Sequence, residues 1–239
     1  MSERFFDVSA FAYAHRGLWD ATRPENSLAA FDAARAARVG VELDVRLTAD
    51  DVPVVFHDAR LERMCGAGAL LADVTAEGLA RFRLPDGSPV PTLAEALTIM
   101  GDLPVLIELK VDGTPPEIAD RVAAAIEGVG RWYGVMSFDE RTVARLCRLV
   151  ADRPVGLLVR TDNLPDVATK AMTARALGCD YIGPHHSILP AMQAASCGLP
   201  MVTWTVRTPA ELELARESGA APIFEGISPA LAMPGGTPI

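Results

Sequence analysis

The 239-residue sequence predicts an α/β protein built as a single (β/α)8 (TIM) barrel, with a small extra β-hairpin after its second strand. Apolar runs alternate with helical patterns from end to end, and eight such units fit within the chain. The apolar runs are almost continuously Val, Ile and Leu, as expected for parallel strands that are buried on both faces. An open doubly wound sheet is the alternative, but no glycine-rich dinucleotide loop follows the first run.

The elements follow in chain order. We expect the first helix to begin at Glu25 and Asn26 and to end before Gly40, by the usual cap preferences. The run at 53–57 lies across a short turn from the second strand and should pair with it as a hairpin. The predicted strands cover residues 11–15, 41–47, 104–110, 132–138, 154–160, 180–186, 200–206 and 221–226.

The helices between these strands carry start and stop signals. Pro91 and Thr92 begin one short helix, and prolines 115–116 begin the next, with Gly128 near its end. The predicted helices cover residues 25–40, 91–100, 115–130, 138–152, 164–178, 187–198, 208–219 and 228–233.

Composition indicates one domain spanning residues 1–239. Half of the residues are hydrophobic, no segment has linker composition, and the last residues, PGGTPI, are expected to fray. No apolar run reaches membrane-spanning length, and the first residues lack a signal-peptide pattern, so we expect a cytoplasmic protein without stable membrane insertion. The four cysteines show no CxxC spacing and are expected to be reduced thiols.

The charge balance restricts the partners. The net charge is −9, and no run is rich in Lys or Arg. Nucleic-acid binding needs clustered cations and is therefore disfavoured. A small anionic substrate remains compatible, because a metal ion and a few local cations create a positive pocket in an acidic protein.

Acidic side chains stand in two apolar runs where packing would favour aliphatic ones. Glu42 and Asp44 share one side of the second strand, as Glu108 and Lys110 share one side of the third. Three carboxylates meeting at a barrel mouth would repel one another, so either one is protonated or a cation lies among them. Oxygen ligands favour one divalent ion, Mg²⁺ or Ca²⁺, over zinc, which prefers histidine or cysteine.

A bland interpretation exists for each pair. A single Glu-x-Asp or Glu-x-Lys is more often solvated or ion-paired. Their occurrence together, within runs where burial of charge is costly, favours a site. All four histidines, His15, His57, His185 and His186, also stand at predicted strand ends, where barrel enzymes carry their functional residues.

These residues form a recognisable series: HRG (15–17), PEN (24–26), VELDVRL (41–47), HD (57–58), IELK (107–110) and WTV (204–206). The series resembles the glycerophosphodiester phosphodiesterase family, metal-dependent (β/α)8 enzymes of the phospholipase C-like superfamily. The resemblance covers most of the chain and is densest from Ala14 to Asp58.

The resemblance implies a role for each matched position. His15 and His57 match the catalytic acid and base, although which is which stays open. The matched residues that bind substrate or phosphate are Arg16, Lys110 and Trp204. The matched metal ligands are Glu42, Asp44 and Glu108, and Glu25 and Asn26 match residues that brace the first loop.

The sequence departs from the family pattern at several places. PIFEGISP (222–229) replaces an Asp- or Asn-rich ending, and Arg207 stands where Asn often follows WTV. The connection from His57 to Pro91 lacks a large helical insertion. His185 and His186 lie outside the pattern, and a structural role is favoured for them. Because of these departures, the sequence does not determine the pocket for the substrate's head group.

The implied reaction is hydrolysis of glycerophosphodiesters to sn-glycerol 3-phosphate and an alcohol. One alternative is a lysophospholipase of D or C type, for which Leu18, Trp19 and Phe138 would supply an apolar mouth. The other alternative is a barrel that binds phosphate esters without catalysis. The preferred alcohol, the metal and the oligomeric state stay undetermined at this stage.

Overall fold

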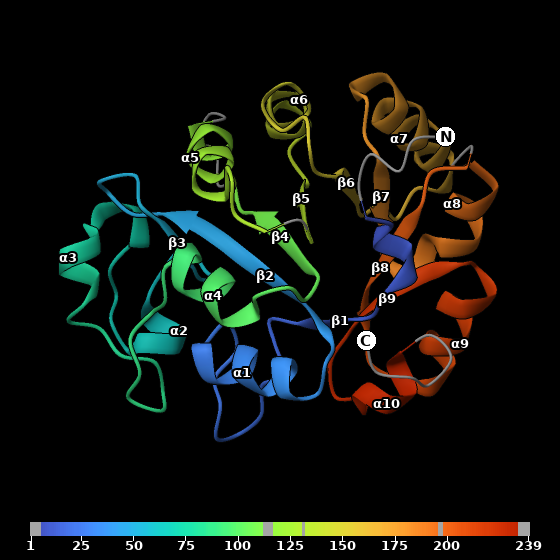
Figure 1. Cartoon of the computed structure of the whole chain (residues 1–239). Coiled ribbons are helices and arrows are strands. Elements are labelled where there is room, and N and C mark those ends of the chain that lie inside the picture. The colour runs from blue at the N-terminus through green and yellow to red at the C-terminus, as the bar shows by residue number, and fades with distance from the viewer. Residues whose placement is uncertain (1–5, 112–116, 131, 196–197, 234–239) are drawn as a thin grey trace.

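A closed ring of eight parallel strands forms the centre of the molecule (Figure 1). The computed structural model describes residues 6–111, 117–130, 132–195 and 198–233. Each strand pairs with its neighbours in chain order, and β1 closes the ring against both β2 and β9, which confirms the predicted barrel. The ring consists of β1 Tyr13–His15, β2 Gly40–Leu47, β4 Val105–Leu109, β5 Tyr133–Ser137, β6 Val155–Val159, β7 Tyr181–Pro184, β8 Met201–Val206 and β9 Ala220–Phe224.

The predicted hairpin is present. Strand β3 (Pro53–Val55) runs antiparallel to β2, outside the ring, with Val45 opposite Val55. It is shorter than the predicted 53–57, so His57 lies two residues beyond its end.

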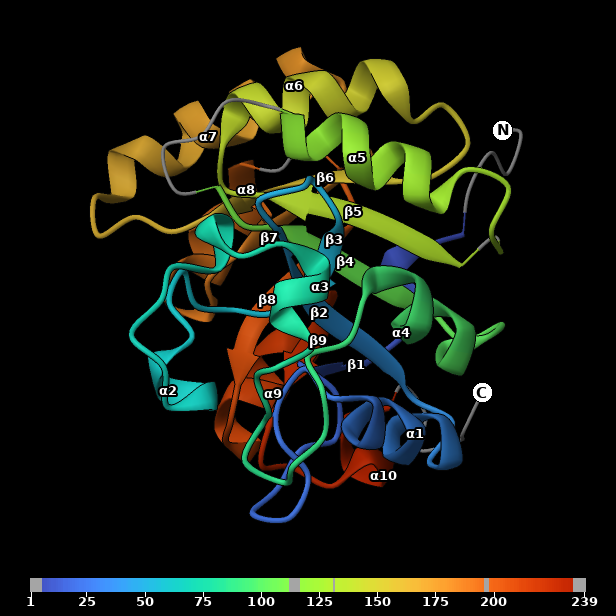
Figure 2. The same ribbon diagram turned by 90° about the vertical axis from the view of Figure 1, so that its left-hand side faces the viewer.

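Helices follow the ring strands and cover the outside of the barrel (Figures 1 and 2). Thr92 and Thr208 each cap a helix through a reciprocal contact with a glutamate three residues later. A one-turn 3-10 helix, η1 (Val8–Ala10), precedes β1, and η3 (His186–Ile188) follows β7. The covering helices are α1 Leu28–Ala36, α4 Leu93–Met100, α5 Glu117–Ile126, α6 Glu140–Leu149, α7 Leu164–Leu177, α8 Leu189–Ala195, α9 Pro209–Glu217 and α10 Pro229–Ala232.

The ends predicted for the first helix were wrong. Ser27 caps α1 by accepting the amide of Ala30, because Asn26 before it has a left-handed backbone. Gly40 begins β2 instead of ending the helix. A Cβ at this position would lie 2.9 Å from the ring of Tyr13, so glycine is required by close strand packing.

The segment between β3 and α4 contains short helices that the sequence analysis did not predict. They are α2 (Glu62–Cys65), η2 (Leu71–Asp73) and α3 (Ala76–Leu79), and each is too short to show a helical hydrophobic period. Phe56, Leu61 and other apolar side chains give this segment a small core of its own. In Figure 2 the segment lies in front of the barrel.

Two apolar layers fill the barrel fold. The larger one packs the outward side chains of the strands against the helices. The smaller one fills the barrel interior with the side chains Val8, Tyr13, Leu106, Met136, Leu158, Tyr181, Val202, Ala221 and Ile223. This interior layer determines which strand positions face the site described below.

Some expectations concern residues outside the described ranges: the tail at 234–239, prolines 115–116 and Cys197. The three described cysteines, Cys65, Cys147 and Cys179, are free thiols. Within the described ranges, no helix combines the length and the apolar character needed to cross a membrane.

Candidate active site

Polar side chains form the layer directly above the apolar interior of the barrel. Side chains two positions apart on a strand face the same way. His15, two positions after the interior side chain of Tyr13, therefore lies in the polar layer above it. By the same spacing, Glu108 follows Leu106 and Trp204 follows Val202. The strand period thus carries the predicted residues to one end of the barrel.

The three predicted carboxylates converge. Glu42, Asp44 and Glu108 offer oxygen atoms that all lie within 4.8 Å of one another, and all three residues are buried. Asp44 and Glu108 are also direct neighbours in the register of β2 and β4.

Two cations face this acidic group. Lys110 Nζ lies 2.7 Å from Glu108 Oε1 and 3.0 Å from Asp44 Oδ1. Arg16 Nε lies 3.0 Å from Asp44 Oδ2. The side-chain Nδ2 of Asn26 donates a hydrogen bond of 2.9 Å to the same oxygen. The predicted bracing residue Asn26 therefore contacts the acidic group directly.

The acidic group is electrostatically crowded. Burial, followed by the charges of Asp44 and Glu108, raises the pKa of Glu42 well above its ordinary value. Burial and the charge of Asp44 raise the pKa of Glu108 to about 7. Although burial opposes it, the charges of Lys110 and Arg16 lower the pKa of Asp44. The three carboxylates, if all ionised, therefore carry more negative charge than Lys110 and Arg16 neutralise.

The donor set fits a hard divalent cation. All three side chains offer carboxylate oxygens, the ligands that Mg²⁺ and Ca²⁺ prefer. Asp44 Oδ1 is buried and accepts no well-aligned hydrogen bond, although Lys110 is close. The acidic group could thus hold a metal ion.

His15 is held by a carboxylate from the last ring strand's end. Its Nδ1 lies 2.6 Å from Glu225 Oε2, and Arg207 Nε donates to the other oxygen of Glu225. Although burial opposes it, His15 and Arg207 lower the pKa of Glu225 to about 2. Glu225 is therefore a carboxylate that fixes the His15 ring. The sequence analysis did not identify this role.

His57 is held in the same manner. Its Nδ1 lies 2.7 Å from Asp58 Oδ1, and Arg63 donates to Asp58 at 2.6 Å. Burial lowers the pKa of His57 below its ordinary value. Arg63 also donates to Glu25 at 2.7 Å, and Glu25 accepts from Arg16 at 2.8 Å.

The loop after β1, which carries the HRG and PEN segments, has an unusual backbone. Arg16 and Asn26 both have positive φ angles, of 60° and 56°. The amide of Asn26 donates to the carbonyl of Arg16 at 2.9 Å, and the amide of Arg16 donates to the carbonyl of Glu42 at 2.8 Å. The HRG and PEN segments thus stabilise each other's left-handed positions.

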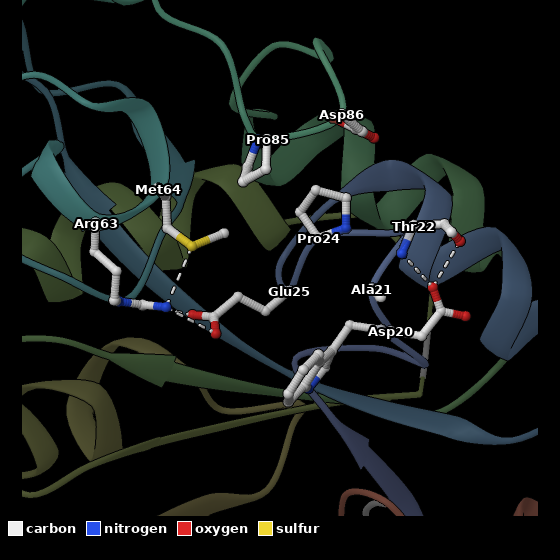
Figure 3. Close-up of a pocket in the computed structure, with 10 residues that line it drawn as sticks. Asp20, Ala21, Thr22, Pro24, Glu25, Arg63, Met64, Pro85 and Asp86 are labelled. Carbon is white, nitrogen blue, oxygen red and sulfur yellow. Dashed lines mark hydrogen bonds and ion pairs between the residues drawn. The ribbon is translucent and has the colours of Figure 1, made fainter.

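Glu25 also lines a separate pocket of about 410 Å³ (Figure 3). Figure 3 shows Glu25 and Arg63 joined at one end of this pocket. Its walls combine apolar and acidic residues from the first loop and the segment after β3, namely Trp19, Asp20, Pro24, Met64, Pro85 and Asp86.

A second cavity, of about 420 Å³, contains the candidate active site. Trp204 forms part of its wall, with Nε1 donating to the Gly183 carbonyl at 2.8 Å. The ring of Trp204 packs edge-to-face against Phe138 and His185, at centroid distances of 5.2 and 4.9 Å. The lining residues are His15, Arg16, His57, Glu108, Lys110, Phe138, Arg160, His185, Trp204, Thr205 and Arg207.

The sequence analysis gave no role to Arg160, which lines the cavity, or to Glu225, which contacts His15. Arg160 lies two positions after Leu158, which faces the barrel interior, and Glu225 lies two positions after Ile223. The strand period could have indicated both. Arg207 follows an irregularity in the pairing of β8 and β9, so the period does not extend to it.

Comparison with known proteins identifies the family of the chain. The model of the "Glycerophosphoryl diester phosphodiesterase family" matches residues 15–225. A Bacillus subtilis (strain 168) protein named as a glycerophosphodiester phosphodiesterase, YhdW, is 30% identical over an alignment of 227 positions that covers 85% of this chain and 90% of that protein.

Solved structures share the fold. A glycerophosphodiester phosphodiesterase from Parabacteroides distasonis superposes with a TM-score of 0.77 at 24% identity, covering 90% of this chain and 91% of that one. An Oleispira antarctica phosphodiesterase, in complex with its product sn-glycerol-3-phosphate, gives 0.80 at 21% identity, covering 90% and 92%.

Proposed function

Because the chain belongs to the glycerophosphoryl diester phosphodiesterase family, we propose that it hydrolyses glycerophosphodiesters to sn-glycerol 3-phosphate and an alcohol in the 420 Å³ cavity. The observation that carries this proposal is the pair of carboxylate-backed histidines, His15 and His57, in a cavity that also exposes Glu108 of the acidic group. The product bound to the Oleispira antarctica relative supports the choice of product.

Glu42, Asp44 and Glu108 would hold one divalent ion, Mg²⁺ or Ca²⁺. When bound, such an ion withdraws electron density from phosphoryl oxygens and offsets negative charge that develops on them. Asn26 keeps Asp44 in place by its hydrogen bond, and Lys110 limits repulsion between Asp44 and Glu108.

His15 and His57 would perform the proton transfers. The Nδ1 atom of each ring faces a carboxylate, so the Nδ1–H donates there and Nε2 is left for the substrate. One histidine accepts the proton of the attacking oxygen, and the other protonates the leaving alkoxide. The attacking oxygen belongs either to water or to the neighbouring hydroxyl of the substrate. Attack by the hydroxyl expels the alcohol and forms a cyclic phosphate, which water then hydrolyses to sn-glycerol 3-phosphate.

Arg16 and Lys110 would bind the anionic phosphodiester, and Trp204 would form one wall of the pocket. Glu25 holds the Arg16 guanidinium at 2.8 Å and thereby keeps it beside the acidic group. The chain's own cations thus reduce the repulsion that a phosphodiester presents to a nucleophile.

A second candidate substrate is a lysophospholipid. The apolar walls that Trp19, Pro24 and Met64 contribute to the neighbouring pocket favour it, since an acyl chain needs such a surface (Figure 3). The exposed side chain of Phe138 would add apolar surface to the 420 Å³ cavity.

Release of sn-glycerol 3-phosphate tests the proposal. The substrates are glycerophosphocholine, glycerophosphoethanolamine and glycerophosphoglycerol, each with Mg²⁺, Ca²⁺ or chelator. We expect metal-dependent turnover that falls by about 10²- to 10⁴-fold in His15→Ala and in His57→Ala. His186→Ala is the matched control, because His186 does not line the cavity.

Metal-loaded protein that hydrolyses none of these esters would contradict the proposal. Turnover of lysophospholipids instead would support the second candidate. Binding of phosphate esters without any turnover would identify a non-catalytic barrel.

A further inference from the structure

Cationic groups that the proposed hydrolysis does not use lie across the ring from the acidic group. Glu42, Asp44 and Glu108 are on β2 and β4, whereas Arg160 and His185 follow β6 and β7. Arg207 follows β8, and all three side chains line the same 420 Å³ cavity as the two candidate catalytic histidines.

The two guanidinium groups have unused hydrogen-bonding capacity. Within the described ranges, the structure gives Arg160 no acidic partner, although acids are abundant in this chain. Arg207 donates to Glu225 through Nε, and its two terminal nitrogens make no hydrogen bond among the described residues. Guanidinium groups with free terminal nitrogens match the geometry of carboxylate and phosphate oxygens.

His185 adds a donor at the same place. Its Nδ1 accepts the backbone amide of Ser187 at 3.2 Å, so the neutral ring carries its proton on Nε2. Burial, followed by the charges of His186, Arg160 and Arg207, lowers the pKa of His185. This direction agrees with an excess of positive charge around the ring.

We propose that Arg160, His185 and Arg207 form a subsite for a second anionic group, a carboxylate or a phosphate, on the alcohol part of the substrate. The inference rests on the proposed function, since it specifies the alcohol that leaves. Oxygen atoms of such a group would accept hydrogen bonds from the two guanidinium groups and from His185 Nε2.

A cationic alcohol such as choline is the main rival, because Trp204 and Phe138 offer aromatic surface. The two arginines would repel it, and the nearby acids are already engaged. Glu225 contacts His15 and Arg207. Glu211 accepts the backbone amides of Arg207 and Thr208. The charge distribution therefore favours an anionic group.

The test compares alcohols that differ in charge and little else. The uncharged alcohol is presented by glycerophosphoglycerol and the cationic one by glycerophosphocholine. The anionic alcohols are presented by glycerophosphoglycerate, in which a carboxylate replaces the terminal hydroxymethyl group, and by the analogue with a terminal phosphate. We expect wild-type kcat/KM to be higher for an anionic alcohol than for glycerol, and lowest for choline. The carboxylate and phosphate arms distinguish which anion the subsite prefers.

Arg160→Gln isolates the subsite, because Arg207 also contacts Glu225 and would disturb His15. We expect this variant to lower the ratio of kcat/KM for the anionic ester to kcat/KM for the uncharged ester by about tenfold. This is the size of effect expected for the loss of one charge-assisted hydrogen bond. Arg148→Gln is the matched control, since Arg148 is exposed in the last turn of α6 and does not line the cavity. A ratio within one sample is insensitive to partial loss of folded protein.

If the wild type hydrolysed the choline or glycerol ester as fast as the anionic esters, or faster, the inference would be overturned and the proposed function left intact. An unchanged ratio in Arg160→Gln would also overturn it. Absence of turnover with every ester would instead reject the proposed function itself.

Discussion

Glu225 connects the candidate catalytic histidine His15 to a more exposed cation, Arg207. The carboxylate lies 2.6 Å from His15 Nδ1 and is only 17% exposed. It therefore fixes both the orientation of the ring and the nitrogen that carries the proton. Glu225 is not among the residues that line the 420 Å³ cavity, so we assign it a positioning role.

We predict that Glu225→Gln lowers kcat by about tenfold to a hundredfold with little change in KM, since an amide cannot stabilise a protonated His15 in the same way. Steady-state kinetics across pH 5–9 would measure it. Glu213→Gln, on the exposed face of α9, is the control. An unchanged kcat would show that Glu225 has no positioning role.

Several other polar residues of the site could be predicted from the sequence because they belong to short motifs of the family pattern. His15, Glu42 and His57 stand in such motifs. Glu225 stands where the family pattern is not kept, and its partner His15 is 210 positions away. No local signal connects two residues at that separation.

At the scale of single elements, the strands determine which side chains enter the site. A period of two places an apolar side chain in the barrel interior and a polar one above it. Strand β6 illustrates this rule with Leu158 and Arg160. The rule requires knowing which face of each strand is interior. A run of Val, Leu and Gly buried on both faces does not reveal this.

Gly156 of β6 gives space to a bulky interior side chain. A Cβ at this position would lie 2.3 Å from the ring of Tyr181, whose hydroxyl donates to the Val135 carbonyl at 3.0 Å. The ring is fully buried and packs among the other side chains of the barrel interior.

We predict that Gly156→Ala destabilises the protein by about 1–3 kcal/mol, through overpacking of the barrel interior. Urea unfolding monitored by circular dichroism would measure the loss. Gly68→Ala is the matched control, because a Cβ there meets nothing within 4 Å. Equal unfolding midpoints for the two variants would contradict this account of the Tyr181 packing.

The segment from α2 to α3 shows the limit of prediction at this scale. Its helices span four residues or fewer, so neither periodicity nor length distinguishes them from turns. Their stability comes from tertiary burial of side chains such as Phe56 and Leu61. Arg63 of α2 also connects the segment to the site through Asp58 and Glu25.

For the whole molecule, closure of the ring concentrates charge of both signs. The chain has a net charge of −9, yet Arg16, Lys110, Arg160 and Arg207 line one cavity. Beside them lie three buried carboxylates whose mutual repulsion opposes folding. A cation that binds only the folded chain would therefore stabilise it.

We predict that saturating Mg²⁺ or Ca²⁺ raises the melting temperature of the wild type by roughly 5–10 °C. Glu42→Gln should abolish most of this increase while raising the melting temperature of metal-free protein, because it removes one of the crowded charges. Differential scanning calorimetry with and without chelator would measure both effects. Glu62→Gln, on the exposed surface of α2, is the control. A wild type that neither ion stabilises would argue against a metal site.

The sequence by itself determined the barrel, the hairpin and the convergence of Glu42, Asp44 and Glu108, because each follows from local periodicity and motif spacing. Only the tertiary structure decided which groups surround that convergence. The contacts of Glu225 with His15, and the gathering of Arg160 and Arg207 across from the acids, arise when the ring closes. Closure brings together the ends of strands that are distant in the chain, and such proximity has no signature in the order of the residues.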